Sequence, residues 1–332
     1  MTVLLLSNDS QNATRVKNFA WSLEQEGYDV VVPYFNTRNW FAIRKQSRKV
    51  IEKLRPDVIH LFNVPDYIYT NFPDMKKESL FKKLVYDYRS PWGIEAGMLF
   101  GDGMIASVTQ NVCERYERKL ACVADMITAP NQPLLDKVLE YRSKDTGDIP
   151  HTIIPNYPIE KYWSQEGVEI PCEDYILYIG RLSNGEGTKN IPILAENFKD
   201  RLFVVVGDGP QKHLVSNGGK YKNIRYIGWQ DQYSIIRFIS MAGVCLVPRD
   251  FTSVTPFSTD RSIWKLNEYL NLEKIVASSG ITQEGYRKNL YTGTDITTVL
   301  GHALDAKKEA LSEADKRYWN LDLKILEGIY EV

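Results

Sequence analysis

The sequence has 332 residues, of which 43% are hydrophobic and 25% charged, and its 41 lysines and arginines balance its 42 aspartates and glutamates. This length and composition are those of ordinary globular proteins with about two domains. A net charge near zero disfavours a dedicated nucleic-acid-binding protein, which usually carries a strong basic excess.

Cysteine and histidine are sparse and scattered. The four cysteines form no CxxC pair and the four histidines stand apart from them, so we expect no metal site and no disulfide framework. The chain begins with an apolar run of only four residues and no basic region, which predicts a strand and not a secretion signal. No apolar run reaches the ~18 residues of a membrane-spanning helix. We therefore expect a cytoplasmic protein, at most peripheral on the inner face of the membrane.

The first half of the chain alternates short apolar runs with amphipathic segments. The amphipathic segments predict helices over residues 13–28, 42–56 and 112–124. The apolar runs predict strands over residues 2–7, 29–34, 57–63, 83–89 and 126–130. Buried strands that alternate with helices indicate a parallel sheet covered on both faces.

The stretch from 153 to 174 breaks this pattern with three prolines and predicts a linker. Strands are then expected at 175–181, 202–209, 223–229, 243–249 and 274–280, and one helix at 314–330. The predicted fold class is α/β, with two Rossmann-like, doubly wound parallel-sheet domains that face each other across a cleft. We expect domains at 1–160 and 161–314, with a C-terminal helix of about 315–332 packing back on the first.

A polar loop follows the first strand of the second half. It begins at Gly180 and contains Arg181 and Lys189, and its spacing is not that of a P-loop. The GxG at Gly207–Gly209 is by itself weak evidence for a nucleotide site. The two cations are either solvated surface charges or an anion site, in which the flexible loop brings backbone and cations close to phosphates.

A second informative stretch runs from 256 to 280. Lys265 and Glu268 are three residues apart, so on a helix they share a face, and Asp260 lies eight residues before Glu268. A helix that begins near Ser262 would point its positive end at an anion. The alternative is an ordinary exposed ion pair, which contributes little.

These motifs together resemble the donor half of a GT-B glycosyltransferase, and specifically glycosyltransferase family 4, the retaining group. The resemblance is strong over residues 175–279 and loose over the first half. It rests on Gly180–Leu182, Lys189, Gly207–Pro210, Gly228, Pro248, Asp260 and Lys265-x-x-Glu268.

The resemblance implies roles for individual residues. Arg181 and Lys189 would bind the donor diphosphate in place of a metal ion, and Glu268 would accept hydrogen bonds from the ribose. Backbone at Gly228 and Trp229 would meet the nucleobase. The remaining implied site residues are Gly180, Gly209 and Lys265 on the donor side and Asp260 at the transferred sugar. The family usually has glutamate at the position of Asp260, and glycine and phenylalanine where this chain has Arg261 and Ser262.

The first half would then hold the acceptor. Asn63, Asp87 and Arg89 follow or end predicted strands and are the acceptor-side candidates, the alternative being loop capping and a structural ion pair. The segment 38–55 is basic and carries aromatic residues, so it predicts either peripheral membrane contact or a solvated helix face.

The predicted function is a retaining, metal-independent glycosyltransferase. It would move a sugar from a nucleoside-diphosphate sugar, UDP- or GDP-linked, to a glycan, lipid-linked or small-molecule hydroxyl acceptor in polysaccharide or glycoconjugate biosynthesis. Two alternatives stay open: a nucleotide-sugar epimerase on the same fold, and a non-catalytic binding subunit that keeps the fold.

Overall fold

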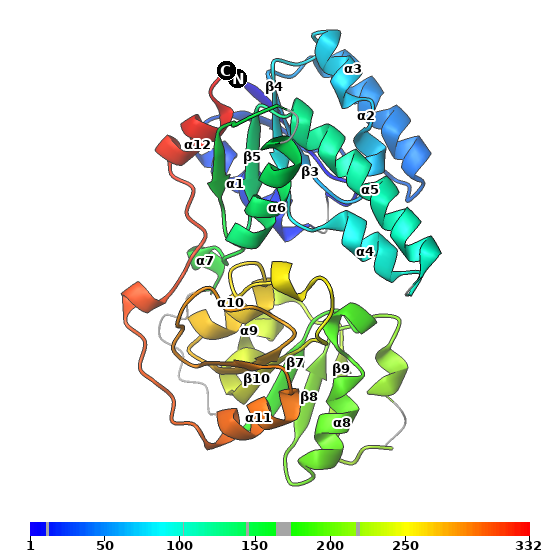
Figure 1. Cartoon of the computed structure of the whole chain (residues 1–332). Helices are drawn as coiled ribbons and strands as arrows, with labels where there is room; N and C mark the ends of the chain where they lie inside the picture. The colour runs from blue at the N-terminus through cyan, green and yellow to red at the C-terminus, as the bar shows by residue number, and fades with distance from the viewer. Residues whose placement is uncertain (11–12, 102, 144–145, 164–173, 217–219) are drawn as a thin grey trace. The chain divides into compact units, whose positions relative to one another are not determined.

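A computed structural model shows the architecture of the chain (Figure 1). It describes residues 1–10, 13–101, 103–143, 146–163, 174–216 and 220–332. The chain forms two compact units. Unit 1 comprises Met1–Pro155 and Asn320–Val332, and unit 2 comprises Asn156–Trp319.

Unit 1 is built on a parallel sheet of six described strands in the order β2-β1-β3-β4-β5-β6. Its strands are β1 (Thr2–Leu6), β2 (Asp29–Val31), β3 (Val58–Phe62), β4 (Lys83–Asp87), β5 (Met126–Ala129) and β6 (His151–Ile153). Its helices are α1 (Thr14–Gln25), α2 (Trp40–Leu54), α3 (Phe72–Lys77), α4 (Trp92–Met98), α5 (Met104–Val123), α6 (Gln132–Ser143) and α12 (Leu323–Tyr330), with the 3-10 turn η1 (Asp66–Tyr69). All five residues of β3 are buried, as expected of a parallel strand covered on both faces.

Unit 2 repeats this plan with the strand order β12-β11-β10-β7-β8-β9. Its strands are β7 (Tyr175–Ile179), β8 (Phe203–Val206), β9 (Ile224–Gly228), β10 (Ala242–Pro248), β11 (Ile275–Ser279) and β12 (Leu290–Gly293). Its helices are α7 (Glu160–Trp163), α8 (Asn190–Asn197), α9 (Gln232–Met241), α10 (Trp264–Asn271) and α11 (Ile296–Asp305), with turns η2 (Asn184–Glu186), η3 (Lys212–Leu214), η4 (Thr255–Phe257) and η5 (Glu313–Asp315).

The two faces of the unit 2 sheet carry separate cores, because successive strand residues point to opposite sides. Ile176 and Tyr178 of β7 pack with α8 and α11. Leu177 and Ile179 of the same strand pack with α9 and α10. The prediction of two doubly wound parallel sheets is confirmed.

Two strands were not predicted, and both lie at a sheet edge. Among the described strands, β6 pairs with β5 alone, through Ile127 and His151, and β12 pairs with β11 alone. Strand β6 reads HTI and β12 reads LYTG, and segments this short with so few apolar residues carry little periodicity. The predicted linker at 153–174 contains α7, and its part at 164–173 lies outside the described residues.

Two predicted helix lengths are wrong. Helix α5 begins at Met104, eight residues before the predicted start at 112. The predicted helix at 314–330 is helical only in η5 and in α12, which begins where Asp322 caps the backbone N–H of Ile325. Between them, Asn271 bonds both the N–H and the carbonyl of Arg317, and these groups are then not available to a helix.

Helix α12 belongs to unit 1 by its contacts. The Tyr330 hydroxyl lies 2.5 Å from Nδ1 of His60 in β3, and Lys83 at the start of β4 donates to the carbonyl of Glu331. No helix among the described residues is long and apolar enough to span a lipid bilayer.

Candidate functional site

The candidate site lies at the carboxyl ends of β7 and β10 in unit 2. From β7 the chain proceeds to β8 and β9 on one side, and from β10 to β11 and β12 on the other. Loops that leave two neighbouring strands in opposite directions open a crevice, which is where ligands bind in open α/β sheets. The loop after β7 begins at Gly180 and the loop after β10 begins at Arg249.

Glycines let these loops approach one another closely. A Cβ on Gly187, whose φ is +72°, would lie 1.7 Å from the carbonyl oxygen of Pro248. A Cβ on Gly209, a predicted donor residue, would lie 2.3 Å from the carbonyl oxygen of Leu182. No side chain fits at either place, so the loops after β7, β8 and β10 are held together by backbone contact.

We expect Gly187→Ala to lower the free energy of unfolding of unit 2 by about 2 kcal/mol or more, because the loop must move away from Pro248 and adopt a strained backbone. Gly185→Ala is the matched control, since its Cβ would meet nothing within 4 Å. Urea unfolding of both variants measures the difference. Equal stability of the two variants would contradict the close approach.

Lys265 and Arg249 meet at a single carboxylate. The Nζ of Lys265 and a guanidinium nitrogen of Arg249 each lie 2.5 Å from a different oxygen of Glu186. Burial would raise the pKa of Glu186, but the two cations outweigh it and lower the pKa to about 2. Burial would likewise lower the pKa of Lys265, and Glu186 outweighs it and raises the pKa. Glu186 and Lys265 therefore both stay charged near neutral pH.

Lys265 extends from α10 toward the loop that follows β7. The Nζ of Lys265 lies 4.4 Å from the ring centroid of Tyr178. A Cβ on Gly180 would lie 2.9 Å from the same Nζ. The predicted donor residues Gly180 and Lys265 are thus neighbours in space, although 85 positions separate them in the chain.

The two loop cations predicted from sequence have different surroundings. Lys189 is exposed and forms an ion pair with Asp250 at 3.0 Å, and Asn190 donates to the same carboxylate. Arg181 is exposed, and its guanidinium has no partner among the residues that the structure describes. Arg181 is therefore the cation that an incoming anion can reach without displacing a protein carboxylate.

Glu268 lies on α10 one turn after Lys265. Burial raises the pKa of Glu268 to about 7, although Lys265 acts in the opposite direction. No hydrogen bond to its carboxylate is found within the described part of the chain. Its carboxylate is thus available to accept hydrogen bonds.

Asp260 is fully buried, and its carboxylate already has protein partners. It accepts from the backbone N–H of Glu284 at 2.7 Å and from Arg287 at 3.3 Å. These contacts give Asp260 a structural role that the sequence did not suggest. Its predicted role at the transferred sugar stays a prediction.

The remaining donor-side candidates follow β9. Gly228 has a φ of +84°, and its carbonyl accepts from the N–H of Gly207 at 2.8 Å. Trp229 comes next, and its side chain is 75% exposed. An aromatic ring at a strand's carboxyl end could stack on a base, and the expectation that this backbone meets a nucleobase stays a prediction.

Sequence reasoning missed Glu186, Arg249 and Asp250. Arg249 carried the same signal as Arg181, a cation directly after a buried strand. No sequence signal distinguishes Glu186 and Asp250 from other acidic residues in loops. Their pairing with Lys265 and Lys189 appears only when distant segments meet.

In unit 1, Asp87 is a buried structural anchor. Arg15 of α1 donates to both of its oxygens at 2.8–2.9 Å, and Thr128 of β5 donates at 2.8 Å. Burial would raise the pKa of Asp87, but Arg15 and His60 lower it well below the ordinary range. The Asp87 side chain has no exposed surface, so the alternative interpretation, a structural ion pair, describes its contacts.

Asn63 and Arg89 join two loops of unit 1. The Asn63 side chain accepts from the backbone N–H of Arg89 at 3.0 Å and donates to the carbonyl of Ser90 at 2.7 Å. The Arg89 side chain donates to the carbonyl of Asn63 at 3.0 Å. Three acceptor-side candidates are therefore engaged within unit 1, and their acceptor roles stay predictions.

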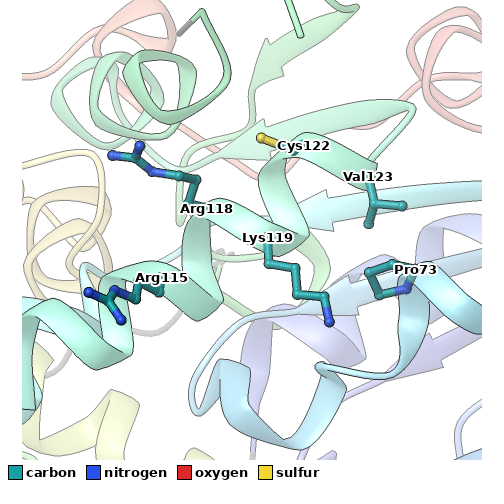
Figure 2. A pocket seen from close by; sticks show the side chains of 6 residues that line it. All are labelled: Pro73, Arg115, Arg118, Lys119, Cys122 and Val123. Atoms are coloured by element: carbon teal, nitrogen blue, oxygen red, sulfur yellow. The ribbon is translucent and has the colours of Figure 1, made fainter. Parts of the chain in front are cut away.

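A separate hollow lies on unit 1, beside α5 (Figure 2). It has a volume of about 430 Å³ and is lined by Pro73, Arg115, Arg118, Lys119, Cys122 and Val123. Figure 2 shows the guanidinium groups of Arg115 and Arg118 extending away from Lys119. Lys119 donates to the carbonyl of Thr70 and Arg118 stacks over Tyr141. The charged groups do not converge on one point, so the hollow gives no evidence of an anion site.

Sequence comparison finds little. No protein-family model matches the chain. Over 103 residues it is 29% identical to the SPbeta prophage-derived uncharacterized protein YonE of Bacillus subtilis (strain 168), covering 30% of this chain and 20% of that protein. The chain thus spans about a fifth of the length of this relative.

Solved structures resemble nearly the whole chain. A sucrose-phosphate synthase from Thermosynechococcus elongatus has a TM-score of 0.63 at 14% identity, covering 92% of this chain and 88% of that chain. The catalytic domain of starch synthase IV from Arabidopsis thaliana, bound to ADP and acarbose, has a TM-score of 0.58 at 11% identity, covering 100% and 95%.

A third structure, HepE of Anabaena in complex with UDP, has a TM-score of 0.57 at 14% identity, covering 92% of this chain and 90% of that chain. At these identities the likeness establishes the fold. The chain has the GT-B fold of two Rossmann-like units.

Proposed function

We propose that this protein is a retaining, metal-independent glycosyltransferase of the family 4 type that uses a UDP- or GDP-linked sugar. The observation that carries the proposal is the group of four cations at the carboxyl ends of β7 and β10, of which Arg181 has no partner among the described residues. The four are Arg181, Lys189, Arg249 and Lys265.

The cation group has the chemistry that a diphosphate requires. Glu186 and Asp250 hold three of the cations in place before any ligand arrives, so little reorganisation is needed during reaction. Arg181 would contact the diphosphate first, and Lys189 and Lys265 would follow. Structures of the same fold that hold UDP or ADP support a nucleotide as the ligand.

The reaction would break the bond between the anomeric carbon and the diphosphate oxygen. Negative charge grows on that oxygen as the bond breaks, and the cations stabilise the charge most strongly in the transition state. The acceptor hydroxyl forms the new bond on the same face, and its proton passes to the departing phosphate. This route needs no protein base and no metal ion.

The acceptor would bind to unit 1 and be a glycan, a lipid-linked sugar or a small molecule with a free hydroxyl. A lipid-linked acceptor fits peripheral membrane contact through the basic segment 38–55 on the cytoplasmic side. An epimerase on the same fold would use the same nucleotide site without an acceptor, and a binding subunit would use it without turnover.

A thermal-shift screen tests the proposal. UDP, GDP, ADP and CMP and their common sugars are added with and without EDTA. We expect one nucleoside diphosphate to raise the melting temperature by several degrees, and EDTA to leave the shift unchanged. A shift lost with EDTA contradicts the metal-free site. If no nucleotide shifts the melting temperature, the proposed donor site is wrong, and the likeness to glycosyltransferases is one of fold alone.

The pH dependence of binding tests the role of Glu268. Its carboxylate accepts ribose hydrogen bonds most strongly when ionised, and its pKa is about 7. We therefore expect nucleoside diphosphate affinity to fall by up to about tenfold per pH unit as the pH drops below 7. Calorimetry from pH 5.5 to 8.5 measures the effect. Glu268→Gln removes this group and leaves only the titration of the phosphate, so identical profiles would contradict the assignment.

A further inference from the structure

The hairpin of α4 and α5 in unit 1 ends in exposed apolar side chains. The exposed set is Met98, Leu99, Phe100, Met104, Ile105, Val108 and Val112. Leu99 is 83% exposed and Met104 is 84% exposed. Apart from Asp102, which lies outside the described residues, the sequence from 98 to 112 contains no charged residue. Single exposed apolar residues are ordinary, but a contiguous group marks an interaction site.

The two helices of the hairpin pack closely against each other at its base. A Cβ on Gly93 would lie 2.4 Å from Cγ of Glu114, and a Cβ on Gly97 would lie 3.2 Å from Cβ of Gln110. The buried carboxylate of Glu117 also accepts from the N–H of Gly93 and from the Tyr88 hydroxyl. The fold itself therefore presents the apolar tip.

Aromatic contacts join the hairpin to the first turn of α2, which lies beside it (Figure 1). The rings of Trp40 and Trp92 are 6.3 Å apart, and Trp92 stacks on Tyr116 at 6.4 Å. Phe41 packs on Tyr67, which packs on Tyr116. Trp40 and Phe41 are themselves exposed, so they extend the apolar surface onto α2.

Cations border this surface. Arg38 and Lys45 are exposed on either side of Trp40 and Phe41 in the chain, and the Arg44 guanidinium lies 5.8 Å from the Tyr67 ring centroid. Apolar side chains, flanked by aromatic rings and then by cations, match the layers of an anionic lipid surface.

We propose that the tip of the α4–α5 hairpin inserts into the interface of an anionic bilayer, while the cations at the start of α2 contact the lipid headgroups. A second copy of the chain is a poorer occupant. A two-fold symmetric contact brings the same patch to both sides, so both copies of Arg38, Arg44 and Lys45 would border one interface and repel each other. The inference does not depend on sugar transfer.

Sedimentation of the full-length protein with vesicles tests the proposal. Vesicles of phosphatidylcholine with a third of phosphatidylglycerol should bind the wild type. Leu99→Ser with Phe100→Ser should lower the partition coefficient by at least about tenfold, because two large apolar side chains no longer leave water. Ile193→Ser with Leu323→Ser is the control, since both residues are exposed and apolar but lie elsewhere, and it should bind as the wild type does.

A charge arm completes the test. Pure phosphatidylcholine vesicles, or Arg38→Glu with Lys45→Glu on anionic vesicles, should each weaken binding about tenfold. The proposal is overturned if the Leu99/Phe100 variant binds anionic vesicles as well as the wild type does. It is also overturned if the wild type does not bind vesicles. Light scattering tests whether a second copy of the chain occupies the tip instead. If the wild type is a dimer that does not bind vesicles, and the Leu99/Phe100 double variant is a monomer, the tip is a dimer interface and the membrane role is overturned.

Discussion

Replacing Arg181 with alanine is expected to lower kcat/KM for sugar transfer by about 10²–10³-fold. Arg181 is the exposed cation of the group without a protein partner among the described residues, so it can give its full charge to the departing diphosphate. Removal of one preorganised donor to a developing anion costs about this factor. Because the charge grows during the reaction, kcat should fall more than KM rises.

The matched control is Arg225→Ala. Arg225 is also an exposed arginine of unit 2, but it lies within β9 and not at a strand end. This variant should keep wild-type kinetics. If both variants lose activity equally, the effect is one of net charge on unit 2. If neither does, the diphosphate does not meet Arg181 and the donor site is misplaced.

Arg15→Met is expected to lower the free energy of unfolding of unit 1 by about 3–5 kcal/mol. The substitution leaves the Asp87 carboxylate buried without its main counter-charge, and removal of one partner of a buried ion pair has this cost. The Arg15 side chain is 2% exposed and that of Asp87 is 0% exposed, so water cannot take the place of the guanidinium. Urea unfolding at pH 7 measures the change, since Asp87, whose pKa is lowered, is fully ionised there.

Arg48→Met provides the comparison at the surface. Arg48 pairs with Glu52 at 2.7 Å, a distance like that of the buried pair, but both side chains are more than a third exposed. Solvent screening should make its loss of stability much smaller than that of Arg15→Met. If Arg15→Met lowers the free energy of unfolding no more than Arg48→Met does, the buried pair does not stabilise unit 1 as we expect.

The same measurement bears on the acceptor side. If Asp87 served only the acceptor, Asp87→Asn would lower kcat and leave unfolding unchanged. The structure leads us to expect a loss of stability in that variant, because Arg15 would then be the uncompensated buried charge. Kinetics of Asp87→Asn are therefore informative only beside its unfolding curve.

Much of the fold was predictable because its signals are local. The central strands β1, β3, β7 and β8 are almost entirely apolar and lie between turn residues, and the helices between them have apolar residues at helical spacing. The edge strands β6 and β12 and the start of α5 were missed. Their structure depends on a neighbouring segment and not on their own composition.

The candidate site likewise has a part that could be predicted from sequence and a part that could not. A cation directly after a buried strand is a sequence signal, and it identified Arg181. Lys265 and Glu268 were placed on one helical face by their spacing. The sequence could not show that Glu186 holds Lys265 and Arg249, or that Asp260 and Asp87 are buried in ion pairs.

Chain order and residue type alone determined the alternation of strands and helices, the two-domain α/β class and the strand-end loops that carry the cations. These follow from periodicity and turn chemistry within about twenty residues. Only the tertiary structure decided which carboxylates neutralise which cations, which cation has no partner within the described part of the chain, and which apolar side chains remain exposed on the α4–α5 hairpin. Each of these depends on contacts between distant segments and on burial, and a pattern read along one segment contains neither.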